Sequence, residues 1–286
     1  MTQYVIDVDQ LHPLLGTPRV RILDVRWTLD KPNGYPDYLE NHIPGATYVS
    51  LDEQLSGHRP DQPHLGRHPL PSVEEFQQTL QCLSVDEKST VVIYDDASSL
   101  AAARAWWLFM WAGLTNVRVL NGGLAAWKDA GYELEHGPDT NERVPSSYSV
   151  TPALPTTDAA GAAELARTGI LIDSRAAERY RGDNEPMDPK AGHIPGAINR
   201  PTTLNTPNGL WLSEDELRKA WNDLGVLDET GKVTAEVGVY CGSGVTACHN
   251  ALSLMSVGVT PVLYGPSWSG WSSDDSNPVA TGDQAS

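Results

Sequence analysis

The stretch CGSGVTA at residues 241–247 places a cysteine at the end of an apolar run and directly before a loop of small residues. Val237, Val239 and Tyr240 precede Cys241, so they predict a strand that carries the thiol at its tip. The backbone N–H groups of a tight glycine-rich loop, and the start of a following helix, would surround that side chain with positive charge. A thiol in this setting is expected to ionise readily, which makes Cys241 the candidate nucleophile.

The loop after the cysteine suits the stabilisation of a sulfur anion. Its glycines let the backbone curl inward, and the hydroxyls of Ser243 and Thr246 can donate hydrogen bonds to sulfur. Cys248, inside the following helical pattern, is interpreted as core packing. The candidate substrate-binding residues of this loop are Gly242, Gly244, Val245 and Thr246.

The two halves of the chain repeat one another. The matched segments are 22–26 with 171–175, 42–46 with 193–197, 91–95 with 237–241, and 119–122 with 262–265. Four matches in the same order and at nearly constant spacing predict a duplicated domain. Asp95 takes the place of Cys241 in the first copy, so only the second copy can perform thiol chemistry.

Short runs rich in Val and Ile alternate with helical patterns in each copy. Helices are predicted at 73–83 and 101–112 in the first copy, and at 214–224 and 245–255 in the second. This order predicts an α/β fold of two tandem domains, each a mostly parallel sheet with helices on both faces. The predicted divisions are a first domain at 1–136, an extended linker rich in Pro, Ser and Thr at 137–156, and a catalytic domain at 157–286.

Composition restricts the partners and the compartment. The 286 residues carry a formal net charge of -17, which disfavours a general binder of nucleic acid or of anionic membranes. No run of eighteen apolar residues and no signal peptide is recognised, so a protein without a membrane span is expected. Three cysteines without a C-x-x-C pair predict neither a disulfide framework nor a zinc site, and fit a reducing, cytoplasmic compartment.

The paired Asp-x-Arg and HIPGA segments, with CGSGVTA in the second copy alone, resemble the tandem rhodanese family of sulfurtransferases from about residue 5 to residue 279. The loop is similar to that of 3-mercaptopyruvate sulfurtransferases, whereas thiosulfate sulfurtransferases more often carry basic residues just after the cysteine. The resemblance implies that the Cys241 thiolate takes sulfur from mercaptopyruvate as a persulfide and releases pyruvate. An acceptor such as cyanide, thioredoxin or a small thiol then removes the outer sulfur, without a metal or organic cofactor.

The resemblance also assigns a proton relay. Ser243 matches a family position proposed to exchange a proton with the histidine of HIPGA in the first domain, here His42. The acidic partner of His42 stays open between Asp30 and Asp37. The equivalent histidine of the second copy, His193, is expected to have a structural role.

The donor's carboxylate needs a cation. By resemblance Arg179 matches a substrate-binding arginine, and a guanidinium can bind a carboxylate at two points. Family members usually supply a second arginine after a Glu-Pro pair, but here Met187 follows Glu185-Pro186. Lys190 is the candidate substitute.

Three other functions are alternatives to a mercaptopyruvate sulfurtransferase. A thiosulfate:cyanide sulfurtransferase would use the same cysteine with another donor, and a sulfur-carrier rhodanese module would take up sulfur without useful turnover. A phosphatase of the Cys-x5-Arg type is disfavoured because the arginine position is Ala247. Without that guanidinium a phosphate would be poorly held.

Overall fold

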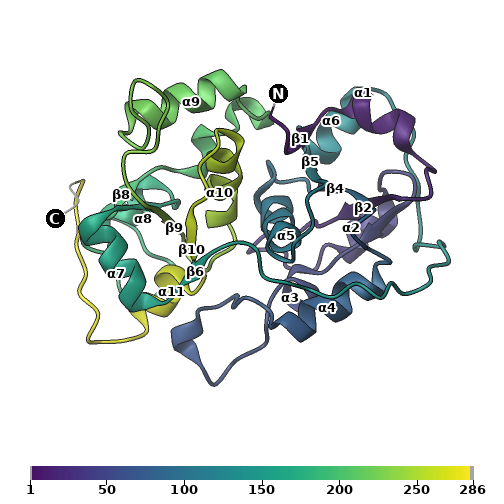
Figure 1. Cartoon of the computed structure of the whole chain (residues 1–286). Helices are drawn as coiled ribbons and strands as arrows, with labels where there is room; N and C mark the ends of the chain where they lie inside the picture. Colours follow the sequence, from purple (N-terminus) through teal and green to yellow (C-terminus); the bar gives the residue numbers. More distant parts are fainter. Residues whose placement is uncertain (1, 284–286) are drawn as a thin grey trace. The chain divides into compact units, whose positions relative to one another are not determined.

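The computed structural model describes residues 2–283 and divides them into two compact units (Figure 1). The first unit comprises the described residues up to Gly57, Pro71–Leu154 and Asn208–Trp211. The second unit comprises His58–Leu70, Pro155–Pro207 and the described residues from Leu212 onward. Each unit therefore takes one short segment that the sequence places within the other half of the chain.

The first unit is built on a five-stranded sheet in the order β1-β5-β4-β2-β3, and every strand pair is parallel. Its strands are β1 (Val5–Ile6), β2 (Val20–Asp24), β3 (Ala46–Tyr48), β4 (Thr90–Tyr94) and β5 (Val117–Leu120). Its helices are α1 (Val8–Leu11), α2 (Tyr35–Glu40), α3 (Leu51–Gln54), α4 (Val73–Cys82), α5 (Leu100–Trp111) and α6 (Gly123–Asp129), with the 3-10 turn η1 (His12–Leu14).

The second unit repeats this plan with the order β6-β10-β9-β7-β8, again fully parallel. Its strands are β6 (Thr156–Thr157), β7 (Ile170–Asp173), β8 (Ile198–Asn199), β9 (Val237–Tyr240) and β10 (Val262–Tyr264). Its helices are α7 (Ala159–Thr168), α8 (Ala177–Arg181), α9 (Glu214–Asp223), α10 (Ala247–Ser256) and α11 (Ser267–Ser272), and its 3-10 turns include η2 (Pro63–Leu65) and η3 (Thr202–Leu204). The turn η4 (Pro207–Gly209) spans the boundary between residues assigned to the two units. Figure 1 shows α7 and α10 on opposite sides of β9 and β10. The predicted α/β fold with two parallel sheets is confirmed.

The longer helices begin where their sequences supply caps. Ser72 starts α4 by accepting the backbone N–H of Glu75, whose carboxylate accepts the N–H of Ser72 in return. Ser213 and Glu216 form the same reciprocal pair at the start of α9. All four helices predicted from periodicity are present, within two residues at either end.

The strand register corrects one of the sequence matches. Ile93 pairs with Val119 in the first sheet, and Val239 pairs with Leu263 in the second. Val119 is therefore equivalent to Leu263, one residue beyond the partner that the sequence comparison gave it. A pattern of Val and Leu alone does not distinguish these two alignments, because both positions are apolar.

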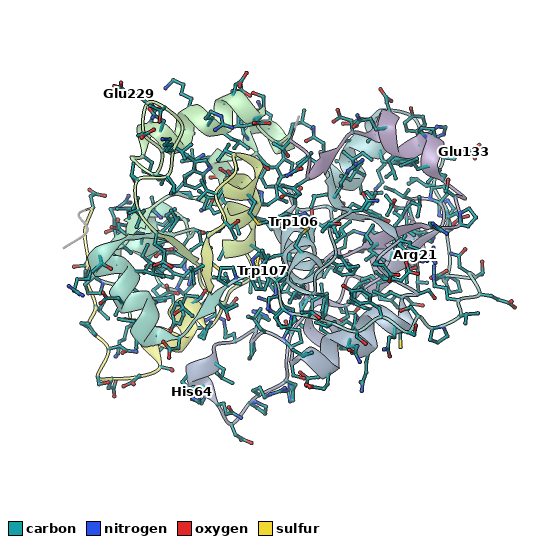
Figure 2. The ribbon with its side chains drawn as sticks, in the orientation of Figure 1. Arg21, His64, Trp106, Trp107, Glu133 and Glu229 are labelled. Carbon is teal, nitrogen blue, oxygen red and sulfur yellow. The ribbon has the colours of Figure 1, made fainter. Side chains whose placement is uncertain are left out.

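Large aromatic side chains fill the first core. Trp106 and Trp107 project from α5 (Figure 2) and are fully buried. The indole N–H of Trp106 donates to the carbonyl of Val117, and its ring meets Tyr4 edge-on at 5.0 Å. Trp106 therefore packs within its own unit. Among residues 2–283, no helix is both long and apolar enough to cross a membrane.

Candidate active site

Cys241 directly follows β9 and is almost fully buried, with 1% of its surface exposed. Its Sγ accepts a hydrogen bond from the N–H of Gly244 at 3.2 Å. Its own N–H donates to Ser267 Oγ at 3.0 Å, and that hydroxyl lies 4.0 Å from the sulfur. The strand, the loop and the start of α11 thus converge on one thiol.

The loop after Cys241 depends on a glycine with a left-handed backbone. Gly244 has φ +81°, and a Cβ at this position would lie 2.3 Å from the carbonyl oxygen of Gly265. Only glycine satisfies both conditions. The remaining predicted loop residues, Val245 and Thr246, connect this turn to the start of α10.

The equivalent loop in the first unit holds a carboxylate. Asp95 is buried, and its two oxygens accept four backbone N–H groups, each at 2.9 Å. The donors are Ala97, Ser99, Ala101 and Ala102. Burial raises the pKa of Asp95, and these N–H groups oppose the rise. This loop type can therefore surround an anionic atom with backbone donors.

Ser243 has a histidine partner that the sequence did not indicate. Its hydroxyl lies 2.8 Å from Nδ1 of His68, on the 58–70 segment that belongs to the second unit. His64 marks this segment in Figure 2. The segment is anchored because the N–H of Arg67 donates to Ser269 Oγ, and because Gly66 comes so close to α11 that a Cβ there would lie 2.4 Å from the carbonyl oxygen of Pro266.

The expected pairing of Ser243 with His42 is therefore corrected. The ring of His42 is buried in the first unit, stacks on Tyr38 at 4.0 Å, and uses Nδ1 for the carbonyl of Tyr38. His193 does the same with Tyr180 in the second unit, at 3.7 Å. Both HIPGA histidines thus stack on a tyrosine and use Nδ1 for the carbonyl of that tyrosine.

The acid near His42 is neither of the two candidates. The carboxylate of Glu135 lies 3.7 Å from its Nε2, whereas Asp37 pairs with Lys31 and Asp30 is exposed. Spacing could not select Glu135, because it lies 93 positions after His42.

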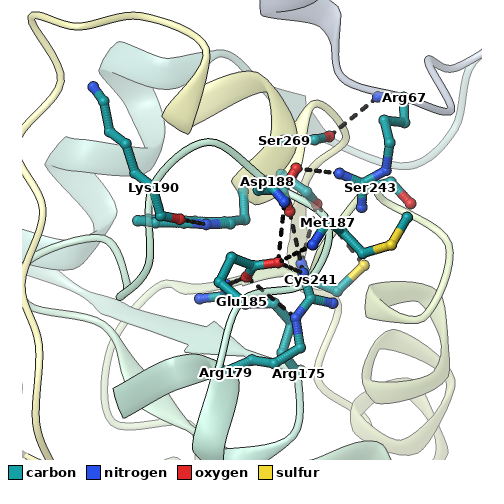
Figure 3. A network of polar contacts seen from close by, with 12 residues as sticks. Arg67, Arg175, Arg179, Glu185, Met187, Asp188, Lys190, Cys241, Ser243 and Ser269 are labelled. Atoms are coloured by element: carbon teal, nitrogen blue, oxygen red, sulfur yellow. Dashed lines mark hydrogen bonds and ion pairs between the residues drawn. The ribbon is translucent and has the colours of Figure 1, made fainter. Parts of the chain in front are cut away.

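Arg179 lies in a network of alternating charges within the second unit (Figure 3). Its guanidinium binds both oxygens of Glu185 and, through Nη2, Asp188 at 3.1 Å. Asp188 also accepts from Nη1 of Arg67, and Glu185 contacts Arg175 at 3.3 Å. Burial raises the pKa of Asp188, and Arg67 opposes the rise. The network ends at the buried pair of Arg175 with Asp173.

Two guanidinium groups face the residue next to the nucleophile. A Cβ on Gly242 would lie 3.2 Å from Nη1 of Arg179 and 3.4 Å from Nη2 of Arg67. These are the nitrogens that the Asp188 carboxylate does not bind. Because Gly242 has no side chain, two cationic groups come close to the backbone of the residue that follows Cys241.

Lys190 does not join this group, which corrects its expected role. Its ammonium donates to the carbonyl of Asp274 at 2.8 Å and lies 3.4 Å from the carboxylate of Asp275. Figure 3 shows the side chain directed away from Cys241. The cation that accompanies Arg179 is Arg67.

The second unit has extra chain at this place. Thirteen positions separate Tyr180 from His193, but only four separate the equivalent Tyr38 from His42. The nine additional residues include those that bind the arginines, Glu185 and Asp188. Sequence comparison of the two copies could have directed attention to this insertion.

The 58–70 segment supplied the other residues that sequence reasoning missed. Arg67 and His68 lie in a stretch without helical or strand periodicity, and long loops of this kind often carry functional groups.

Among residues 2–283, no set of three or more His, Cys, Asp or Glu side chains is arranged to hold a metal ion.

Comparison with known families agrees with this architecture. The rhodanese-like domain family matches the chain twice, over residues 7–130 and 158–274. The chain belongs to the rhodanese family of sulfurtransferases. The family prediction is confirmed, with one rhodanese-like match in each half of the sequence.

Relatives of this rhodanese extend over nearly its whole length. A putative thiosulfate sulfurtransferase, SseB of Mycobacterium tuberculosis, is 43% identical over 93% of this chain and 92% of its own. A probable 3-mercaptopyruvate sulfurtransferase of Pseudomonas aeruginosa is 42% identical over 98% of each. The crystal structure of the 3-mercaptopyruvate sulfurtransferase SseA from Escherichia coli matches with a TM-score of 0.80, at 29% identity, over 94% of this chain and 99% of that one. The relatives agree on the reaction class and differ in the sulfur donor that their names give.

Proposed function

We propose that this rhodanese transfers sulfur from 3-mercaptopyruvate, through a persulfide on Cys241, to a thiol or cyanide acceptor. The observation that supports mercaptopyruvate as the donor is the hydrogen bond between Ser243 and His68. Pyruvate leaves as an enolate and needs a proton, whereas sulfite leaves thiosulfate as a stable anion without one. A hydroxyl and imidazole two residues from the nucleophile suit the first leaving group.

The first half-reaction forms an S–S bond and breaks a C–S bond. The Cys241 thiolate attacks the donor's sulfur, and the electron pair of the C–S bond passes to the carbon that becomes the enolate of pyruvate. The Ser243 hydroxyl gives its proton to the enolate, and His68 replaces that proton from solvent. The donor's own thiol proton stays on the outer sulfur of the persulfide until it is lost to solvent.

The second half-reaction restores the thiolate. A cyanide or thiolate attacks the outer sulfur, the S–S bond breaks, and its electron pair returns to Cys241. No net oxidant or reductant is needed with cyanide. With a thiol, the product is a persulfide of that acceptor.

Asp95 indicates how the persulfide is stabilised. A carboxylate oxygen is two bonds from Cβ, as is the outer sulfur of a cysteine persulfide, so the two charges extend a similar way into the loop. Counted from the strand register, the four donors to Asp95 correspond to backbone positions at Ser243, Val245, Ala247 and Cys248. We infer that these N–H groups hold the outer sulfur anion.

The acceptor and compartment follow from the same chemistry. A thiol acceptor such as thioredoxin, in a reducing cytoplasmic compartment, is supported by three cysteines that are all free. A persulfide on Cys241 would be removed by the same small thiols that keep Cys82 reduced.

The test is thiocyanate formation from cyanide, with mercaptopyruvate and thiosulfate as parallel donors. Wild type is compared with Cys241→Ser and with Cys82→Ser, which removes an exposed thiol from the other unit. We expect kcat/KM to favour mercaptopyruvate by about tenfold or more, with activity lost in Cys241→Ser and kept in Cys82→Ser. A preference for thiosulfate would refute the proposed donor. A single round of sulfur uptake on Cys241, without steady-state product formation, would indicate a sulfur carrier.

A further inference from the structure

Two arginines from distant parts of the sequence approach the backbone of Gly242. Arg67 comes from the 58–70 segment and Arg179 from α8, and 112 positions separate them. Each directs one terminal nitrogen at the position of a Gly242 Cβ, at 3.4 and 3.2 Å. Guanidinium nitrogens donate strong, charge-assisted hydrogen bonds to carboxylate oxygens, so two arginines that approach one position can bind one carboxylate together.

Asp188 fixes the orientation of both arginines. Its carboxylate, with 2% of the side chain exposed, accepts from Nη1 of Arg67 and Nη2 of Arg179. The opposite nitrogens, Nη2 of Arg67 and Nη1 of Arg179, are thereby turned to Gly242. The Nε of Arg67 is buried without a partner, so this side chain keeps donor capacity beyond its bond to Asp188.

We propose that Arg67 and Arg179 together bind the carboxylate of the sulfur donor beside Gly242, with Asp188 as the positioning residue that aligns them. Arg67, on the 58–70 segment, then takes the role of the second arginine. The uncharged Met187 stands at the place where family members usually have that arginine. This assignment rests on the proposed function for the identity of the donor, but not for the anion site itself.

The charges around this site also select among anions. Three carboxylates and three arginines alternate through the network, namely Asp173, Arg175, Glu185, Arg179, Asp188 and Arg67. They balance, so the site has no surplus positive charge before a donor binds. A donor with one negative charge near the arginines is therefore accepted at a lower electrostatic cost than a dianion such as thiosulfate. Removing the charge of Asp188 gives the site one surplus positive charge.

A chemical probe tests the anion site without relying on turnover. Iodoacetate and iodoacetamide alkylate a thiolate in the same way, but only iodoacetate carries a carboxylate. The rate constants for both reagents at Cys241 are measured by peptide mass spectrometry in a Cys82→Ser background. Their ratio reports how well the surroundings of the cysteine bind a carboxylate, and dividing the two rates removes changes in thiol reactivity.

The variants are Arg67→Gln, Arg67→Lys and Asp188→Asn, with Arg218→Gln as the matched control. Arg218 pairs with Glu214 on α9 and is 40% exposed, so its loss changes the net charge equally at another place. We expect the iodoacetate-to-iodoacetamide ratio to fall about tenfold in Arg67→Gln, and less in Arg67→Lys. It should rise in Asp188→Asn, because the amide oxygen can still accept from an arginine while the site gains one surplus positive charge. It should stay unchanged in Arg218→Gln.

Turnover provides the second readout. We expect Arg67→Gln to raise KM for mercaptopyruvate about tenfold with a smaller change in kcat, and Asp188→Asn to increase relative use of thiosulfate. An alkylation ratio in Arg67→Gln equal to that of wild type and Arg218→Gln would overturn the assignment of Arg67. If neither wild type nor any variant turns over mercaptopyruvate, the proposed donor is refuted. The alkylation ratio still decides in that case whether the two arginines form an anion site. Far-UV circular dichroism and thermal melting confirm that each variant is folded.

Discussion

Nδ1 of His68 lies 2.8 Å from Oγ of Ser243, although 175 positions separate the two residues along the chain. The contact forms because the 58–70 segment packs with the second unit, where Gly66 and Arg67 meet α11. An imidazole from the first half of the sequence thus reaches the loop of the nucleophile. The serine hydroxyl alone is a poor acid, and a histidine partner supplies the exchangeable proton.

Replacing His68 by glutamine is therefore expected to lower kcat with mercaptopyruvate about a hundredfold, because proton transfer to the enolate loses its imidazole. His42→Gln is the matched comparison. It is expected to leave kcat within about twofold and to lower the free energy of unfolding by about 1 to 2 kcal/mol, since it removes a buried hydrogen bond to Tyr38. Steady-state kinetics and urea unfolding measure the two effects. The reverse pattern, with kcat lost only in His42→Gln, would restore the relay first expected from the sequence.

The two loop glycines should respond differently to alanine. In Gly242→Ala the new Cβ meets the ends of two flexible arginine side chains, at 3.2 and 3.4 Å, so the fold can accommodate it. We expect KM for mercaptopyruvate to rise about tenfold with little change in melting temperature, because the methyl group displaces the two guanidinium groups that we propose bind the donor's carboxylate. In Gly244→Ala the Cβ meets a backbone oxygen at 2.3 Å and the residue has φ +81°.

Gly244→Ala should therefore lower the melting temperature and reduce kcat, because the turn that brings an N–H to Cys241 is displaced. Kinetics and thermal melting of both variants, measured side by side, separate a loss of binding from a loss of loop geometry. Equal melting temperatures for the two alanine variants would argue against the backbone role given to Gly244.

The sequence was sufficient for the fold because its signals are local. Alternating apolar runs, helical periodicity and repeated motifs predicted the helices and the parallel sheets, and the comparison of copies identified Cys241 as the distinguishing residue. The nucleophile's surroundings were readable for the same reason, since 241–247 is continuous in sequence.

The rest of the site is not local, and this is why it was missed. His68 and Arg67 reach the loop of the nucleophile only because a segment without periodicity packs against α11 of the other half. Resemblance to the HIPGA motif favoured His42, whereas the structure gives both HIPGA histidines the same stack on a tyrosine. Lys190 lies close to Met187 in the sequence, but the direction of its side chain depends on how the nine-residue insertion folds.

The two cations considered for the donor's carboxylate can be distinguished directly. Arg179→Gln is expected to raise KM for mercaptopyruvate about tenfold or more, because a charge-assisted hydrogen bond beside Gly242 is lost. Lys190→Gln should leave KM unchanged, since its ammonium binds the carbonyl of Asp274 and the carboxylate of Asp275. Michaelis–Menten analysis of the two single variants is the measurement. A larger KM effect from Lys190→Gln would show that the lysine turns to the donor when it binds.

The carboxylate of Asp95 provides the last prediction, because it holds the first unit's loop in place of a substrate anion. Asp95→Asn puts an NH2 group where N–H donors converge, so some of the four backbone donors at 2.9 Å lose their acceptor. We expect the free energy of unfolding to fall by about 3 kcal/mol, since each buried unsatisfied donor costs on the order of 1 to 3 kcal/mol. Asp96→Asn, at the exposed neighbouring position, should change it by less than about 0.5 kcal/mol.

Activity in these two variants tests the division of labour between the copies. The nucleophile, Ser243, His68 and both arginines belong to the second unit, so kcat/KM of the folded Asp95→Asn protein should stay within about twofold of wild type. Chemical unfolding and kinetics at a temperature well below the melting transition measure stability and activity separately. A loss of kcat/KM without a loss of stability would mean that the anion held by the first loop takes part in sulfur transfer, and that its carboxylate is more than a structural replacement for a persulfide.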